Sequence, residues 1–299
     1  MRIVLNTFRY NYNPLLMDMD DGEHVVLFVN EDLHPSLEAD NNTYSYHQFF
    51  LILKACEMLH GHLKSHSVPC IFTTKWSEIP DIPAGEKVLC DHITDPMFSE
   101  IKERMSSTYG NCLSFVSTNT ILDWSIPSHR DVVDDHMNKN TPYAKLNSMK
   151  RHIIENVRPP LQINLKSKKQ SRSYEKDTPS NLKIILLRIV GKMKELRMQV
   201  RFPFSNEENV IEYSTKRIAL CRHPWKKPHT DPSIQLYSQS ANELGNTSQI
   251  SPFLSVGLLC PSHVWELSVD KDTSQSSFRG QLLWRECFHA LSNDERFWI

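Results

Sequence analysis

The sequence predicts an α/β protein, in which a doubly wound parallel sheet comes first and an all-α region follows. Over residues 1–128, short apolar runs alternate with amphipathic helical patterns, as in parallel strands joined by right-handed crossovers. From residue 181 to residue 299 the patterns are mostly helical. Residues 129–180 contain a polar, basic stretch that is typical of an inter-domain linker. The sequence therefore predicts two domains, 1–128 and 181–299, joined by this linker.

Five short runs carry the predicted strands. Each is largely apolar and rich in branched or aromatic residues, which is typical of strands buried on both faces. They span Arg2–Leu5, His24–Val29, Val68–Phe72, Lys87–Ile93 and Asn111–Val116. No Gly-x-Gly-x-x-Gly follows the first run, so nothing here predicts independent nucleotide binding by the sheet.

Two helices are predicted between the strands, over residues 44–65 and 95–107. Both show apolar residues at helical spacing, which indicates one face packed on the sheet. The predicted buried residues are Phe49, Ile52, Leu53, Cys56, Leu59 and Leu63 in the first helix and Phe98, Ile101 and Met105 in the second.

The middle of the chain is basic and then strongly apolar. Residues 158–180 carry six cations and few apolar side chains, which favours a solvated linker; a nuclear-localisation or DNA-phosphate role is the alternative. Residues 182–202 are apolar, but Lys183, Arg188, Lys192 and Lys194 exclude a membrane span. A long core helix is expected there.

The composition limits which partners and which cellular compartment are expected. The net charge is −1, so any DNA contact must come from a local basic patch. The seven cysteines form no Cys-x-x-Cys pair, and the fourteen histidines show no metal-ligand spacing. Reduced thiols in a nuclear or cytoplasmic setting are expected, with no structural metal.

The segment Thr247–Leu254 predicts a phosphate site. Its first five residues include three hydroxyls, on Thr247, Ser248 and Ser251, and Pro252 follows. Serine followed by proline favours a helix start, where exposed N–H groups and the positive end of the helix dipole attract anions. The alternative is an ordinary Ser-Pro helix start that binds nothing.

A second segment, Gly280–Glu286, lies in a helix predicted from about residue 277. Gln281, Trp284, Arg285 and Phe288 recur at i, i+3, i+4 and i+7 and therefore share one face. An amphipathic helix with one polar face explains this pattern. A stacking surface beside a phosphate-binding arginine explains it as well.

Together the two segments resemble the flavin-binding domain of the photolyase and cryptochrome family, in which Thr-Ser-x-Leu-Ser-Pro-Tyr-Leu-x-x-Gly cradles the FAD diphosphate. Gly257 matches the glycine, and Gly-Gln-Leu-Leu-Trp-Arg-Glu is most like the animal cryptochrome and six-four photolyase branch. The resemblance implies DNA contact by Trp284 and Arg285. It implies FAD binding by Tyr237, Thr247, Ser248, Gln249, Ile250, Ser251 and Gln281.

The N-terminal half is similar to the antenna domain of the same family. Phe8-Arg9 and Asn13–Leu16 resemble its opening, and Thr141–Tyr143 resembles its closing segment. Tyr10-Asn11 replaces the usual Arg-Asp pair, which removes an ion pair. The family implies a folate or deazaflavin antenna, but no residue of this sequence places it.

The implied function is that of a blue-light flavoprotein that repairs ultraviolet-damaged DNA or signals to a protein partner. The sequence given ends at Ile299, within the family's FAD-binding domain, so an incomplete domain, weak FAD affinity and no repair by this chain alone are expected. Family activity as a DNA photolyase is thus in question. The alternatives are a non-catalytic cryptochrome-like binding or regulatory protein and an unrelated two-domain nucleotide-binding enzyme.

Overall fold

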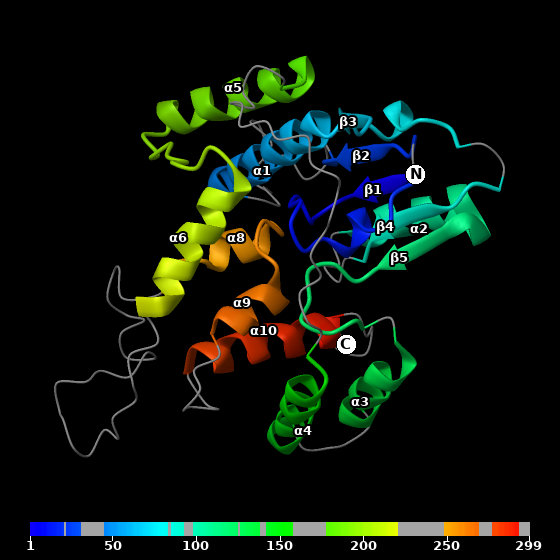
Figure 1. Ribbon diagram of the computed structural model, residues 1–299, viewed down its shortest axis with the longest axis vertical. Coiled ribbons are helices and arrows are strands. Elements are labelled where there is room, and N and C mark those ends of the chain that lie inside the picture. Colours follow the sequence, from blue (N-terminus) through cyan, green and yellow to red (C-terminus); the bar gives the residue numbers. More distant parts are fainter. Residues whose placement is uncertain are drawn as a thin grey trace.

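The computed structural model describes most of the chain as a parallel sheet with helices that cover and extend it (Figure 1). The described residues are 1–20, 22–30, 45–82, 85–92, 98–124, 126–137, 142–157, 178–220, 248–268 and 277–292.

The five predicted strands are confirmed, and all of them are parallel. The order is β3-β2-β1-β4-β5, so the direction of winding reverses between β1 and β4. Ile3 at the centre of β1 pairs with Val26 on one side and Cys90 on the other. The strands are β1 Arg2–Val4, β2 Val25–Phe28, β3 Cys70–Thr73, β4 Val88–Asp91 and β5 Leu113–Val116.

Helices α1 (Tyr46–Ser65) and α2 (Ser99–Tyr109) connect strands and cover the sheet. The side chain of Ser45 caps α1 by accepting the N–H of Gln48 at 3.2 Å. All the apolar residues predicted for the buried faces of these two helices are buried. Short 3-10 helices span Pro14–Leu16, Trp76–Glu78 and Gly110–Cys112.

The expected linker contains regular structure. Helices α3 (Pro127–Met137) and α4 (Pro142–Glu155) pack against each other and against the last helix (Figure 1). Met149 and Ile153 of α4 are buried, which explains why this stretch is helical. The basic residues 158–177 lie outside the described residues, as does Thr141 of the predicted closing segment.

The long helix expected over residues 182–202 is wrong in extent. Helix α5 spans Ser180–Glu195. Arg197 adopts φ +55°, and the N–H of Met198 donates to the carbonyl of Met193 at 2.8 Å. This is a Schellman ending, after which residues 198–206 run irregularly to α6 (Glu207–Leu220).

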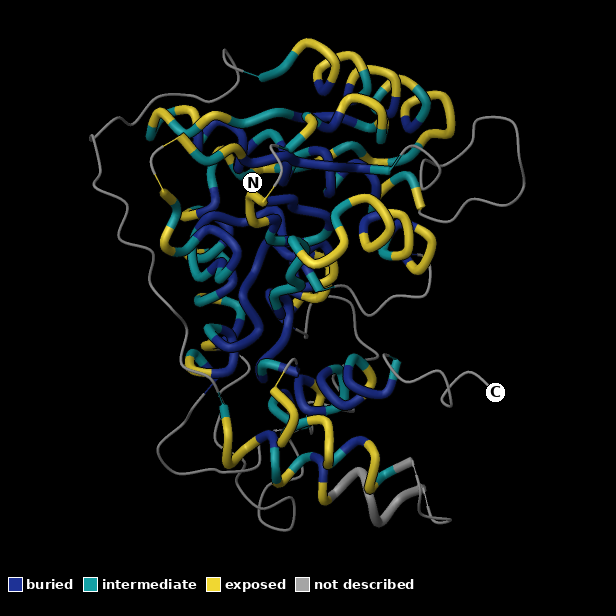
Figure 2. The backbone as a smooth tube through the Cα atoms, turned by 90° about the vertical axis from the view of Figure 1, so that its right-hand side faces the viewer, coloured by how far each residue is buried: buried dark blue, intermediate teal, exposed yellow. Residues whose placement is uncertain are grey.

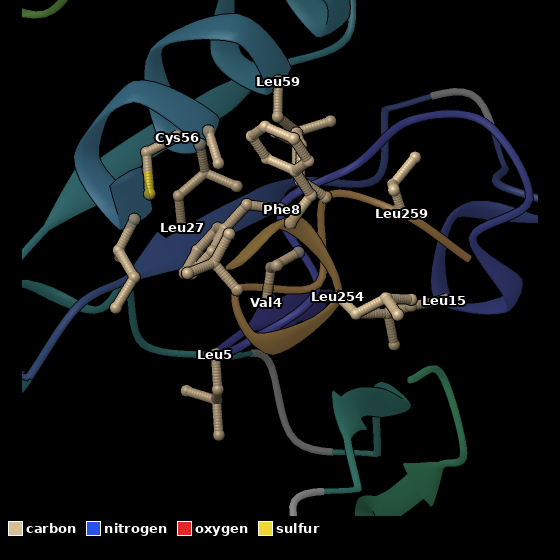
Figure 3. Packing of buried hydrophobic residues seen from close by; sticks show 14 of the residues in the cluster. Val4, Leu5, Phe8, Leu15, Leu27, Cys56, Leu59, Leu254 and Leu259 are labelled. Atoms are coloured by element: carbon tan, nitrogen blue, oxygen red, sulfur yellow. The ribbon is translucent and has the colours of Figure 1, made fainter. Parts of the chain in front are cut away.

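In the described residues after α6 lie three helices, α8 (Ser251–Ser255), α9 (Pro261–Leu267) and α10 (Ser277–Ser292). In the described residues beyond 178, helices are the only regular elements, as predicted. The chain between α8 and α9 runs against the carboxyl end of β1. Figure 3 shows Leu254 and Leu259 beside Val4 and Phe8 in the same apolar core.

Gly257 makes the close approach at this junction possible. Its φ is +65°, and a Cβ added to it would lie 2.0 Å from the carbonyl oxygen of Asn6 and 2.7 Å from the Cα of Thr7. The buried guanidinium of Arg9 donates to the carbonyl of Gly257 at 3.0 Å and to that of Tyr12 at 3.2 Å. The helical region is therefore fixed directly to the loop that leaves β1.

The buried carboxyl group of Glu207, at the start of α6, makes a second connection to this loop. It accepts the N–H of Tyr10 at 2.6 Å and the N–H of Asn11 at 2.9 Å. Burial raises the pKa of Glu207 to about 8, although both hydrogen bonds and the nearby Arg9 oppose the shift.

Gly257→Ala should lower the free energy of unfolding by roughly 2–5 kcal/mol, because the methyl group meets backbone and φ is positive. Urea denaturation would measure this. Gly191→Ala is the matched control, since a Cβ there meets nothing within 4 Å. It lies inside α5, so it should stabilise by about 0.5–1 kcal/mol. Equal effects of the two substitutions would contradict the close approach.

Glu207→Gln should weaken the pH dependence of stability. Because the pKa is raised from 4.5 to about 8 on folding, the native state retains a proton that the unfolded chain releases. Stability should therefore fall as the pH rises through this interval. Denaturant titrations across these pH values should show a shallower fall in the variant. Glu212→Gln, which removes an exposed carboxyl on the same helix, should keep the parental slope; a Glu207→Gln slope equal to the parent's would refute the idea.

Candidate functional site

The crevice where doubly wound sheets bind nucleotides lies at the carboxyl ends of the strands, where the winding reverses. In this chain a carboxylate lies there. One side-chain oxygen of Asp91 accepts the N–H groups of Leu5, Asn6 and Thr7 at 2.8, 3.0 and 3.1 Å. Three successive N–H groups form the kind of cradle that elsewhere holds phosphate, so an internal side chain uses this position.

The predicted phosphate segment is placed on the helical side of the molecule. Helix α8 begins at Ser251 as expected, but Ile250 occupies the N-cap position and no side chain caps the helix. Gln249 turns the chain with φ +56°, which puts Ser251 inside the first turn. Because α8 has five residues, its dipole is small, and anion binding here needs additional charge.

Helix α6 supplies that charge. The Nε of Arg217 donates to the carbonyl of Ser248 at 3.4 Å, and the hydroxyl of Tyr213 donates to Oε1 of Gln249 at 3.1 Å. Ser248 and Ile250 are buried, whereas Ser251 is exposed. The segment thus exposes Ser251, and the guanidinium of Arg217 holds the segment three residues earlier, at Ser248.

An apolar cleft of about 900 Å³ opens beside this segment, between α1, residues 201–204, α6 and α8. Phe204 is central to its aromatic wall, with ring centroids 5.4 Å from Phe202, 5.2 Å from Tyr213 and 5.5 Å from Phe253. Polar groups join the same lining, namely Arg201, Ser251 and Ser255.

This arrangement can hold a planar ring with an anionic group at its edge. Aromatic side chains offer stacking faces, and a cleft of this size is within the range of ligand sites in proteins. Hydroxyl and guanidinium donors suit phosphate oxygens.

Other predicted cofactor residues are not gathered here. Gln281 lies exposed on α10, a different helix. Tyr237 and Thr247 lie outside the described residues.

The Trp-Arg-Glu sequence of α10 is divided between the interior and the surface. Arg285 donates to the carbonyls of Asn119 at 3.2 Å and Leu254 at 3.5 Å. Burial lowers the pKa of Arg285 to about 10, so it stays cationic near neutral pH. The buried carboxylate of Glu286 accepts the N–H of Leu122 at 2.9 Å and the indole N–H of Trp124 at 2.8 Å. Both residues therefore join α10 to the chain that follows β5.

Trp284 is half-buried. The Nζ of Lys150, on α4, lies 3.7 Å from its ring centroid, a cation–π contact. Its ring stacks on the exposed Phe288 at 5.8 Å between centroids. The two residues predicted to contact DNA thus have different surroundings: Arg285 holds internal carbonyls, and Trp284 lies in an aromatic patch beside a cation.

The described residues hold neither a candidate metal cluster nor a candidate membrane-spanning helix. No group of three or more His, Cys, Asp or Glu side chains there could hold a metal ion. Among the helices of that same part, none is both long enough and apolar enough to cross a membrane.

Sequence reasoning missed the residues that α6 and the preceding loop contribute. Tyr213 and Arg217 are four residues apart on one face of α6, and Phe202-Pro203-Phe204 ends the apolar run. Those spacings were visible, but only the fold shows that they meet the segment at Ser248, more than thirty positions later.

Comparison with known proteins finds similarity in structure only. No family model matches the chain, and no curated protein matches it. Among solved structures, it is similar to an archaeal photolyase from Sulfolobus tokodaii, crystallised with two FAD molecules, with a TM-score of 0.57 and 12% identity. The match covers 99% of this chain and 60% of the photolyase. The chain therefore has a photolyase-like fold, an α/β sheet domain followed by helices.

Proposed function

We propose that the chain is a photolyase- or cryptochrome-like flavoprotein that binds FAD in the cleft between α6 and α8. One observation carries the proposal: Ser251 of the predicted phosphate segment lines the same cleft as the aromatic rings. Stacking groups and phosphate-binding groups, which lie far apart in the sequence, are thus side by side. The photolyase-like fold supports the same conclusion.

The side chains around the cleft are of the chemical types that a flavin nucleotide needs. Phe204 and its neighbours offer flat apolar faces for the ring system, and Ser251 offers a hydroxyl to the diphosphate. Arg217 and Arg201 supply positive charge near the segment and in the cleft lining. When bound, FAD would supply blue-light absorption and electron transfer, while the protein would orient the ring and keep water from its face.

A light-harvesting chromophore is the alternative occupant of the same cleft. The Sulfolobus photolyase contains two FAD molecules, one described as a novel light-harvesting cofactor. The cleft borders α1 of the sheet domain as well as α6 and α8, so an antenna folate, deazaflavin or second flavin would meet the same aromatic wall. The assignment to the animal cryptochrome or six-four branch rests on residues Gly280–Glu286 alone.

Titration with FAD, followed by flavin fluorescence, tests the cleft. We expect weak binding, with competition by ADP if the diphosphate contacts dominate. Arg201→Gln, which removes the guanidinium from the cleft lining, should weaken affinity about tenfold or more, since a hydrogen bond to a charged group contributes roughly 1.5–3 kcal/mol. Lys216→Gln is the control, because that lysine pairs with the exposed Glu212 on the same helix. No flavin binding, or equal affinity of both variants, would contradict the site.

DNA contact is proposed at the patch of Trp284, Phe288 and Lys150. Trp284→Ala should weaken binding to a damaged duplex, by loss of base stacking worth about 1–3 kcal/mol, and leave the melting temperature nearly unchanged. Arg285→Ala should lower the melting temperature, because Arg285 holds two internal carbonyls. Fluorescence anisotropy and thermal unfolding measure the two effects. A destabilised Trp284→Ala with parental DNA affinity would reassign the tryptophan to packing.

A non-catalytic binding or regulatory role is the alternative function. The absorption spectrum of the purified protein discriminates between the two, because flavin bands support the flavoprotein and a bare protein spectrum supports the regulator.

A further inference from the structure

Helix α5 has one buried face and one solvent-exposed face. Leu182, Leu186, Ile189 and Met193 are buried, where the helix packs on α1 and β3. The side chain of Asn181 donates to the carbonyl of Phe72 at 2.9 Å and so fixes the start of the helix to the edge strand. The position of α5 therefore does not depend on its outer face.

The outer face presents apolar side chains to solvent. Ile184 is 58% exposed and Leu187 64% exposed, within one turn of each other. Gly191 follows one turn later, with nothing within 4 Å of the place where a Cβ would stand. Figure 2 shows α5 at the top of the molecule with an exposed outer side. An exposed apolar pair beside a glycine lets another backbone approach closely.

Positive charge borders this pair. Residues 180–197 carry five cations, Lys183, Arg188, Lys192, Lys194 and Arg197, and a single carboxylate, Glu195. Lys192 pairs with Glu195 at 3.1 Å. Since the whole chain has a net charge of −1, α5 concentrates positive charge that the rest of the sequence balances.

We infer that the outer face of α5 is a docking site for an amphipathic, acidic helix of a protein partner. Ile184 and Leu187 form the apolar centre, and the flanking cations attract carboxylates at the rim. A second copy of the chain would place these cations against one another, which costs free energy. Duplex DNA would bring phosphates onto two apolar side chains. An acidic amphipathic helix offers apolar side chains to Ile184 and Leu187 and carboxylates to the cations around them.

The probe is a labelled synthetic helix of about four turns, to match the 16 residues of α5. It carries leucines at i, i+3, i+4 and i+7 and glutamates on either side. Binding to the full chain is followed by anisotropy. Ile184→Glu should weaken binding at least tenfold, and so should an increase in salt from about 50 to 500 mM. Ile154→Glu is the control, since Ile154 is 49% exposed on α4. The Ile154→Glu variant should bind the labelled helix with the affinity of the parent.

Thermal unfolding must show that Ile184→Glu keeps the parental melting temperature, as an exposed position predicts; Ile184→Gln is the substitute if it does not. No binding of the acidic helix, or equal binding of a lysine-flanked helix, would overturn the inference. Self-association, vesicle binding or DNA binding that Ile184→Glu abolishes would also overturn it, and would assign α5 to that occupant instead.

Discussion

The contact between Gly257 and the loop after β1 fixes the rest of the structure. A glycine backbone lies against Asn6 and Thr7, closer than any side chain allows, and the guanidinium of Arg9 holds the carbonyls on either side of that approach. A cation buried with oxygen partners is strongly oriented, because leaving it unpaired would be costly. The position of α8, and with it the wall of the aromatic cleft, follows from this one approach.

The same loop also bears on why the cleft proposed for flavin lies away from the carboxyl ends of the strands. Asp91 uses three N–H groups at the reversal of winding, Glu207 uses two more on the same loop, and Arg285 and Glu286 use groups in the chain after β5. Acidic and basic side chains thus satisfy the backbone at the edge where doubly wound sheets bind ligands. Of the concave surfaces in the described residues, the cleft lined by aromatic rings lies between α1, α6 and α8.

The five parallel strands and the sheet helices could be predicted because parallel strands and their crossovers leave strong local patterns, such as the stripe from Phe49 to Leu63. The end of α5 could not, since it depends on Arg197, a non-glycine residue with positive φ. Ser251 was predicted as a cap and is the first helical residue instead, a shift of one position that local propensity does not resolve. The roles of Arg285 and Glu286 depend on partners about 165 positions away, which no window of sequence contains.

The separation of Arg9 from Gly257 bears on the order of events during synthesis. The two residues are 248 positions apart, so a ribosome releases the first strand long before the carbonyls that its loop requires. Until residues 257–259 emerge, the nascent sheet carries an arginine destined for burial and an uncovered apolar edge around Phe8. Contacts between residues so far apart in the sequence form slowly, and the apolar surface that they will bury stays exposed until they form. The nascent chain should therefore depend on chaperones until α8 and α9 are complete, and the sheet domain should mature last although it is made first.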